Sequence, residues 1–220
     1  MPEGEPLIRW DWLLDHTDDI AARLVEHVWL TVIAVVVGFA ISFVLALIAV
    51  RRGWTYGPIT AVTGILYTIP SLALFAILVP ITGLSVLTAE IALVGYTLLI
   101  LIRNIVAGIQ GVPADVTEAA EGMGFSTTSR LIRVELPLAL PVIVAGLRIA
   151  TVTTIGLVTV AALIGQGGLG KLIEDGLSRR FSTLYITGAV LSVVLAVLAD
   201  AGFVLLQRAL TPWARARTAR

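Results

Sequence analysis

The chain has 220 residues, of which 58% are hydrophobic and 14% are charged, and its formal net charge is zero. About a quarter of the residues of a soluble domain are charged, so this composition is typical of a membrane protein. A net charge of zero gives no indication of a nucleic-acid partner. The chain has no cysteine, which excludes disulfides and thiol chemistry. Its two histidines, His16 and His27, show no metal-binding pattern, so we expect no metal site.

The first 27 residues are predicted to form an amphipathic segment on the outer membrane surface. Apolar side chains between Trp10 and Val25 recur at helical spacing. The opposite face of this helix is charged and carries Asp11, Asp15, Asp18, Asp19 and Arg23. A solvated face explains these charges, and docking of an external receptor on the acids is the alternative.

Five apolar runs are long enough to cross a bilayer as helices, which takes roughly 20 residues each. The runs cover residues 28–50, 58–80, 84–109, 138–164 and 184–206. An open sheet would leave backbone groups unpaired in lipid, and the alternation of a membrane barrel is missing. We therefore predict an all-α membrane domain over residues 28–210 with five transmembrane helices.

The placement of basic residues predicts how these helices are oriented, because cytoplasmic loops are enriched in Lys and Arg. Arginines are more frequent on the side that holds Arg51, Arg130 and the tail 211–220 than on the side of Arg23 and Lys171. The N-terminus is therefore expected outside and the C-terminus, with its basic tail, in the cytoplasm.

A polar segment, residues 110–137, separates the third and fourth predicted spans. Pro113 and Asp115 predict the start of a short helix. Gly124 stands where that helix would end with a positive φ, which costs glycine least. The apolar positions expected to share one face of this helix are Val112, Val116, Ala119, Ala120 and Met123.

A second short helix is expected after Gly124. Ser126 or Thr127 can cap its first turn, and it should run to Leu136, where Pro137 and Pro141 suit the opening of the fourth span.

This segment resembles the coupling loop of importer-type ABC permeases. The matching residues occur at fixed spacing and are Glu118, Ala119, Ala120, Gly124, Leu136 and Pro137. The resemblance implies that a separate ATPase binds the loop. In that case Glu118 would make a polar contact, Ala119 and Ala120 would pack closely against the ATPase, and Gly124 would form the turn. An ordinary polar loop with an amphipathic turn is the alternative.

Most of the chain from Leu24 onward resembles the permease subunits of glycine betaine, choline and carnitine importers, which share the methionine-permease fold. The segments that carry this likeness are 67–75, 101–111 and 145–170. The likeness implies a multi-pass protein of the cell membrane that transports osmoprotectants by alternating access. It also implies a second permease copy or paralogue, two ATPase subunits and a separate external substrate-binding protein. ATP and Mg²⁺ would bind the ATPases, so this chain is expected to be no enzyme and to hold no cofactor.

Two other transport functions are alternatives. One is an ABC permease for methionine or another amino acid. The more distant one is an ion-coupled secondary transporter, which should carry acids near the membrane midplane. We identify Asp200 as the one acid well within a span, which favours the ABC interpretation.

Residues 165–172 nearly match a nucleotide-binding phosphate loop, but Leu172 replaces the hydroxyl residue that would hold Mg²⁺. The segment also follows a predicted membrane span and not a buried strand. We interpret it as a turn, or a point of close packing, at the outer end of the fourth span. Its glycines are Gly165, Gly167, Gly168 and Gly170.

Four residues inside the spans are candidates for a pathway or gate. Pro70 breaks the second span near its middle, and Ser71 or Thr68 could bond the carbonyl that the break frees. Arg148 and Asp200 lie deep in the fourth and fifth spans, where a charge is costly. They could form a pathway pair or a structural pair, or Arg148 could extend to the interface.

Three aromatic residues in the spans, Tyr67, Phe75 and Tyr96, could offer cation–π surfaces to a quaternary ammonium. Packing against protein or lipid is the alternative for each.

Overall fold

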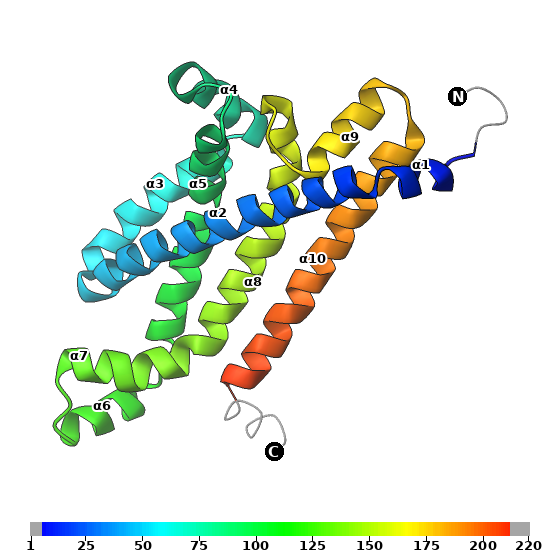
Figure 1. Ribbon diagram of the computed structural model, residues 1–220. Coiled ribbons are helices and arrows are strands. Elements are labelled where there is room, and N and C mark those ends of the chain that lie inside the picture. The colour runs from blue at the N-terminus through cyan, green and yellow to red at the C-terminus, as the bar shows by residue number, and fades with distance from the viewer. Residues whose placement is uncertain (1–5, 212–220) are drawn as a thin grey trace.

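The computed structural model describes residues 6–211, and these form only helices and connecting turns (Figure 1). The α-helices are α1 (Trp10–Asp15), α2 (Thr17–Arg51), α3 (Tyr56–Thr68), α4 (Ser71–Thr82), α5 (Val86–Gln110), α6 (Ala114–Gly122), α7 (Thr127–Arg130), α8 (Leu136–Val160), α9 (Leu169–Ser178) and α10 (Ser182–Leu210). Short 3-10 turns cover Gly53–Thr55 and Ala161–Ile164, and a π-helix covers Leu131–Glu135.

Four of these helical stretches are long and apolar enough to cross a membrane: α2, α5, the continuous stretch Thr127–Ile164, and α10. A fifth span is possible if α3 and α4 are taken together, although they are bent by 95°. The expected all-α architecture is therefore confirmed, but the predicted run 58–80 is not one straight helix. Ile69, before the proline, has an extended backbone with ψ 126°, because the ring of Pro70 disfavours a helical conformation there.

Helix α2 runs without a break from the predicted amphipathic segment into the first predicted span. Its 35 residues span about 52 Å at 1.5 Å per residue. A bilayer core is about 30 Å thick, so α2 must be tilted or extend beyond the hydrocarbon. Figure 1 shows α2 crossing obliquely over α5 and α8. The boundary expected between residues 27 and 28 thus falls inside one helix, and the predicted tail 211–220 lies, apart from Thr211, outside the described residues.

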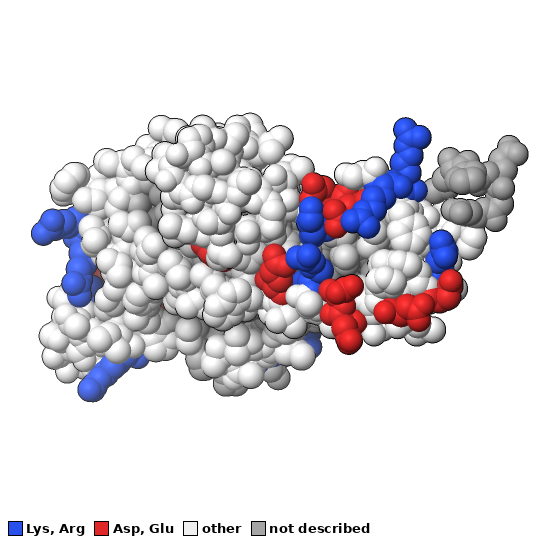
Figure 2. Space-filling model, turned by 45° about the horizontal axis from the view of Figure 1, so that its top comes forward, with Lys and Arg blue, Asp and Glu red and all other residues white. Residues whose placement is uncertain are grey.

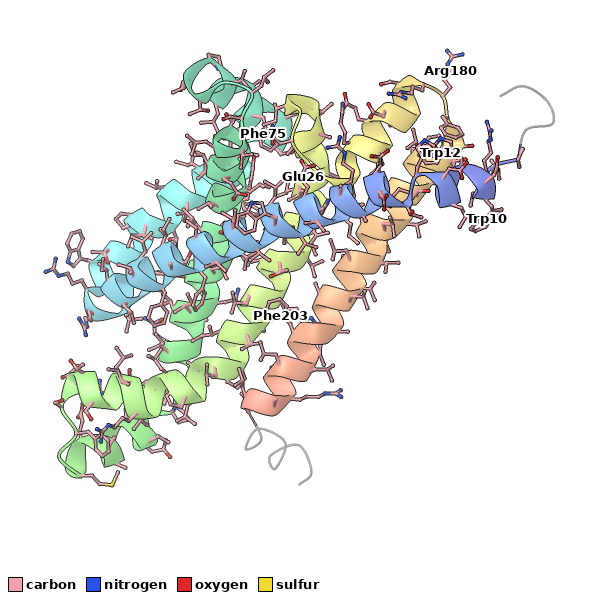
Figure 3. All side chains as sticks on the ribbon, viewed as in Figure 1. Trp10, Trp12, Glu26, Phe75, Arg180 and Phe203 are labelled. Carbon is pink, nitrogen blue, oxygen red and sulfur yellow. The ribbon has the colours of Figure 1, made fainter. Side chains whose placement is uncertain are left out.

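The N-terminal segment packs against the protein through one of its faces. Trp12, Ile20 and Leu24 pack on a small cluster formed by α9 and α10. Trp12 also lies edge-on to Phe181, with 5.3 Å between ring centroids. Trp10, by contrast, is 69% exposed and points away from the bundle (Figure 3).

Two apolar clusters form the core, and α5 contributes to both. One joins α5 to α2, α4 and the end of α8, and the other joins α5 to α2, α8 and the π-helix. Small residues allow close contact, as is common in membrane bundles. A Cβ at Gly146 of α8, for example, would lie 2.5 Å from the Cβ of Asn104.

Helix α10 lies at one side of the bundle and packs on α8 and α9. No residue in its most apolar stretch is buried within the chain. This large apolar surface is suited to contact with lipid or another membrane helix. Figure 1 also shows that the molecule has two distinct ends, which we call the α9 end and the α6–α7 end.

Candidate functional site

The polar loop forms the helix and the turn that its sequence predicts. Helix α6 begins after Pro113, and the Asp115 Oδ1 atom accepts a hydrogen bond from the Val116 amide at 3.0 Å. Gly124 has a φ of +83°, the left-handed conformation that glycine adopts readily. A Cβ at Gly124 would have open space around it, so backbone conformation, and not crowding, requires glycine here.

The prediction that Ala119 and Ala120 lie on one apolar face of α6 is wrong. Ala120 is 1% exposed and packs inside the chain, whereas Ala119 is exposed. Met123, expected on the same apolar face, is 70% exposed. Consecutive helical residues are about 100° apart around the axis, so two adjacent alanines present different surfaces. The surface that α6 offers to another molecule therefore includes Glu118, Ala119 and Met123.

The second short helix continues further than expected. Ser126 caps it, with its Oγ accepting from the Ser129 amide at 3.3 Å, so this cap is confirmed. The helix then passes through the π-helix into α8 instead of ending near Leu136. The π-helix ends at Glu135, two residues before Pro137. Pro137 has no amide to donate, and a change from i→i+4 to i→i+5 bonding is one way to accommodate that loss.

Arg130 links the two parts of this loop. Its Nε donates to Glu135 Oε1 at 2.6 Å, and its Nη1 contacts the carboxylate of Glu121 on α6. The side chain of Glu135 is 9% exposed and that of Arg130 is 22% exposed. Residues five apart lie on different faces of an α-helix, so the wider π-turn helps Arg130 to reach Glu135. We call this three-residue contact the Arg130 brace.

Sequence reasoning used Arg130 only to assign orientation and missed the brace. The acids nine residues before and five after the arginine are the only sequence signal, and that spacing matches no α-helical pair.

The break between α3 and α4 opens a hollow of about 270 Å³. Its lining comes from α3, α4, α5 and α8 and consists of Tyr67, Thr68, Ile69, Pro70, Ser71, Tyr96, Thr153 and Leu157. The Tyr96 hydroxyl donates to the Ile69 carbonyl, and Thr68 Oγ1 donates to the Ile65 carbonyl at 2.7 Å. Tyr96, which was not expected in this role, thus joins Thr68 in satisfying the carbonyls near the break. We call this space the break hollow.

Of the three candidate aromatic residues, two line the break hollow and one does not. The rings of Tyr67 and Tyr96 meet edge to face with their centroids 6.0 Å apart. Phe75 is 0% exposed and packs in the core, so the suggestion that it offers a cation–π surface is wrong (Figure 3). Sequence alone cannot distinguish these cases, because all three residues lie in apolar runs.

Arg148 and Asp200 form a pair between α8 and α10. The guanidinium donates through both Nε and Nη2, and the Nη2–Oδ2 distance is 2.8 Å. The two side chains are 40% and 37% exposed and border a surface hollow of about 320 Å³. The paired arrangement is confirmed, and a role in a pathway stays a prediction.

The glycine-rich segment packs closely on α2 and on the end of α8. Gly165, Gly167 and Gly168 have φ values of +80°, +137° and +50°. A Cβ at Gly168 would lie 2.6 Å from the Arg23 carbonyl oxygen, and one at Gly170 would lie 2.3 Å from the Thr159 carbonyl oxygen. The predicted turn with close packing is thus present, and it follows a 3-10 turn and not the strand that precedes a phosphate loop.

Charged side chains gather around this α9 end, over α1, α9 and the start of α2 (Figure 2). Glu26, labelled in Figure 3, accepts from the Gly167 amide at 3.2 Å and from Arg23 at 3.0 Å. Lys171 donates to Glu174 at 2.8 Å. This hydrogen bond raises the pKa of Lys171 above its ordinary value. Within residues 6–211, no three acids or histidines are grouped as metal ligands.

Glu90 in α5 is a further acid that sequence reasoning overlooked. Its side chain lies in the predicted run 84–109 and is 9% exposed. Neither carboxylate oxygen has a hydrogen-bond partner among the described residues. The interpretation of Asp200 as the one acid well within a span is therefore wrong, and the single acid in an apolar run was the available signal.

Comparison with known proteins assigns a family. The family described as binding-protein-dependent transport system inner membrane component matches residues 35–213. The osmoprotectant import permease protein OsmW of Salmonella typhimurium is 37% identical over 206 residues, which cover 91% of this chain and 96% of OsmW. The glycine betaine/carnitine/choline transport system permease protein OpuCB of Bacillus subtilis is 36% identical, covering 85% of this chain and 86% of OpuCB.

Among solved structures, a chain of the inward-facing MetNI methionine ABC transporter superposes with a TM-score of 0.74 at 22% identity. The match covers 93% of this chain and 100% of that one. At this identity the similarity establishes the fold, and the predicted methionine-permease-like architecture is confirmed.

Proposed function

Because this chain belongs to the family of inner membrane components of binding-protein-dependent transport systems, we propose that it carries osmoprotectants such as glycine betaine, choline or carnitine into the cell. Membership makes it a multi-pass ABC permease subunit that is no enzyme and works with an ATPase and a binding protein. The support for the substrate class is that relatives with this class in their names match most of both chains at 36–37% identity.

An importer of methionine or another amino acid is the second candidate for the substrate. Its support is a shared fold at 22% identity, and unrelated functions often share a fold. Sequence identity to the osmoprotectant permeases is higher, at 36–37%, which favours the osmoprotectants.

The orientation that fits this function places the α6–α7 end in the cytoplasm. The arginine distribution supports it, since Arg51, Arg52, Arg130 and Arg133 all belong to that side. The α9 end, with its charged surface, then faces the external binding protein. Two ATPase subunits and a second permease, identical or paralogous, complete the assembly that we propose.

The coupling surface that we propose is the exposed side of α6. Glu118 and Ala119 lie on this side, and Gly124 sets the turn that follows. The Arg130 brace joins α6 to the π-helix, which continues into α8. A push on α6 can therefore be passed to a membrane-spanning helix, and alternating access follows if α8 moves with it.

Substrate identity is tested by uptake in a strain that lacks its own osmoprotectant importers. The chain is expressed with its ATPase and binding protein, and labelled glycine betaine, choline, carnitine and methionine are supplied at high and low osmolarity. We expect uptake of at least one quaternary ammonium solute and none of methionine. Uptake of methionine alone would contradict the proposed substrate class.

The coupling surface is tested with Ala119→Asp, because Ala119 is exposed and a carboxylate there should disturb the ATPase contact without disturbing the fold. Thr128→Asp on α7, also exposed, is the matched control. We expect Ala119→Asp to retain a normal amount of permease in the membrane but to lose copurifying ATPase and uptake. Normal uptake by an assembled Ala119→Asp complex would rule this surface out.

A further inference from the structure

The break hollow has a wall chemistry that suits one class of solute. The described residues that line it are all uncharged, and two of them are tyrosines. Tyr67 is 39% exposed, so part of its surface is accessible, whereas Tyr96 is 5% exposed. The Tyr96 hydroxyl is held by the Ile69 carbonyl, and this contact fixes the ring against which Tyr67 packs.

The end of α3 adds a partial negative charge to this wall. Tyr67 and Thr68 are the last residues of α3, which has 13 residues. The last carbonyls of a helix have no partner in the helix, and the aligned peptide dipoles place about half a negative charge there. A cation in the hollow would therefore meet the accessible ring of Tyr67 and a helix terminus of favourable sign.

We propose that the break hollow is a transient binding site for the quaternary ammonium group of the transported solute, with Tyr67 as the contacting residue and Tyr96 as the positioning residue. This inference rests on the proposed function, because it assumes a quaternary ammonium substrate. A trimethylammonium group is large and weakly hydrated, and it is attracted to the face of an aromatic ring without needing a hydrogen bond. A hollow of about 270 Å³ lies just below the range of about 300–1,000 Å³ usual for ligand pockets.

The described wall of the break hollow contains no carboxylate, and this suits a site through which a cationic solute has to pass. A buried ion pair would hold the cation tightly, whereas a site on a transport pathway must release it. Cation–π contact is weaker, about 0.5–2 kcal/mol. Thr153 and Leu157 form the α8 part of the wall, and α8 is continuous with the braced π-helix. Movement of α8 would thus alter the hollow and release the solute.

The test uses the complete transporter, with its ATPase and binding protein, in proteoliposomes. Transport of labelled choline and glycine betaine is measured together with ATP hydrolysis. For Tyr67→Leu we expect about two- to thirtyfold less solute moved per ATP, the range that loss of one cation–π contact gives. Tyr67→Phe, which keeps the ring, should stay close to the parent protein. Tyr185→Leu on α10, outside the hollow, is the matched control.

A second measurement separates ring electrostatics from packing. Phenylalanines with increasing fluorination, placed at position 67, keep the ring's shape but weaken the negative potential of its face. We expect solute moved per ATP to fall stepwise along this series, and a packing role would give no such trend. This series also decides the matter if Tyr67→Leu fails to assemble.

The outcomes distinguish the site from the function. If the parent protein imports choline or glycine betaine, and neither Tyr67→Leu nor the fluorinated series lowers the yield per ATP, the site is overturned and the proposed function stands. If the parent protein imports no quaternary ammonium solute, the proposed function and the site are both overturned.

Discussion

The α9 end and the α6–α7 end are held together in different ways. At the α9 end, glycines let backbone meet backbone, as where Gly168 contacts α2 and Gly170 contacts the end of α8. At the α6–α7 end, the loop is held by the charges of the Arg130 brace, and Gly124 has free space around it. Close backbone contacts cannot yield without unfolding, whereas an ionic contact can stretch and re-form. We infer that the α9 end keeps one rigid arrangement and call it the fixed end. We infer that the α6–α7 end transmits force to the spans and call it the load-carrying end.

The largest effect is expected at the fixed end. Gly170→Val adds atoms where even a Cβ would lie 2.3 Å from a backbone oxygen. Such overpacking costs about 1–3 kcal/mol and occasionally more, and contact with rigid backbone places Gly170→Val at the upper end, so we expect little assembled protein and a lower Tm in detergent. Gly156→Ala is the control, because a Cβ there meets nothing within 4 Å. Normal yield and Tm for Gly170→Val would contradict the fixed-end interpretation.

At the load-carrying end, Arg130→Ala should impair transport more than assembly. Removing the guanidinium leaves the nearly buried Glu135 carboxylate without its cation, and a charged hydrogen bond contributes about 1.5–3 kcal/mol. We expect uptake to fall about tenfold or more while the ATPase remains bound and active in the purified complex. Arg133→Ala, an exposed arginine in the same π-helix, is the control. Equal loss in both variants would show that the brace has no special role.

Between the two ends, the Arg148–Asp200 ion pair joins α8 to α10. Exchanging its charges tests whether this pair holds the two spans together. Arg148→Asp or Asp200→Arg alone should place two like charges side by side in the membrane and reduce the amount of folded permease. The double exchange should restore most of it, as measured by the monodisperse fraction in size-exclusion chromatography. If the double variant is no better than the single ones, the two residues act independently.

The smallest effect is expected from the cap of α7. Ser126→Ala removes the acceptor for the Ser129 amide, which costs about 1 kcal/mol. Hydrogen exchange at Ser129 should become faster while uptake changes little. Thr127→Ala, the neighbouring residue without this cap bond, should leave exchange at Ser129 unchanged.

Local signals in the sequence were enough to predict much of the α6–α7 end. Pro113, Gly124 and Ser126 each act on their own backbone, so the first helix, the left-handed turn and the cap could be predicted. Which neighbouring alanine would be buried could not, because it depends on how α6 packs on α7. The brace was missed for a similar reason, since it needs the π-helix that brings Arg130 to Glu135.

In the spans, hydropathy predicted the number of apolar runs but not their shape. Pro70 indicated a break, yet its 95° angle depends on contacts such as the bond from Tyr96 to Ile69. The pairing of Arg148 with Asp200 was one of several alternatives, because hydropathy does not say which faces of two helices meet. Glu90 was overlooked because a single acid hardly changes the hydropathy of a 25-residue helix.

The continuity of α2 gives the molecule a single stiff rod between its two ends. Near its start, the backbone at residues 23 and 27 is in contact with Gly168. Near its finish, Ala46 and Ala49 share a core cluster with Leu131 of the π-helix. These points are about 33 Å apart along the axis. Because α2 is held in place near its start and is one unbroken helix, a small shift beside Leu131 would tilt the whole helix across the bilayer. No kink lies between the two contacts to absorb the movement.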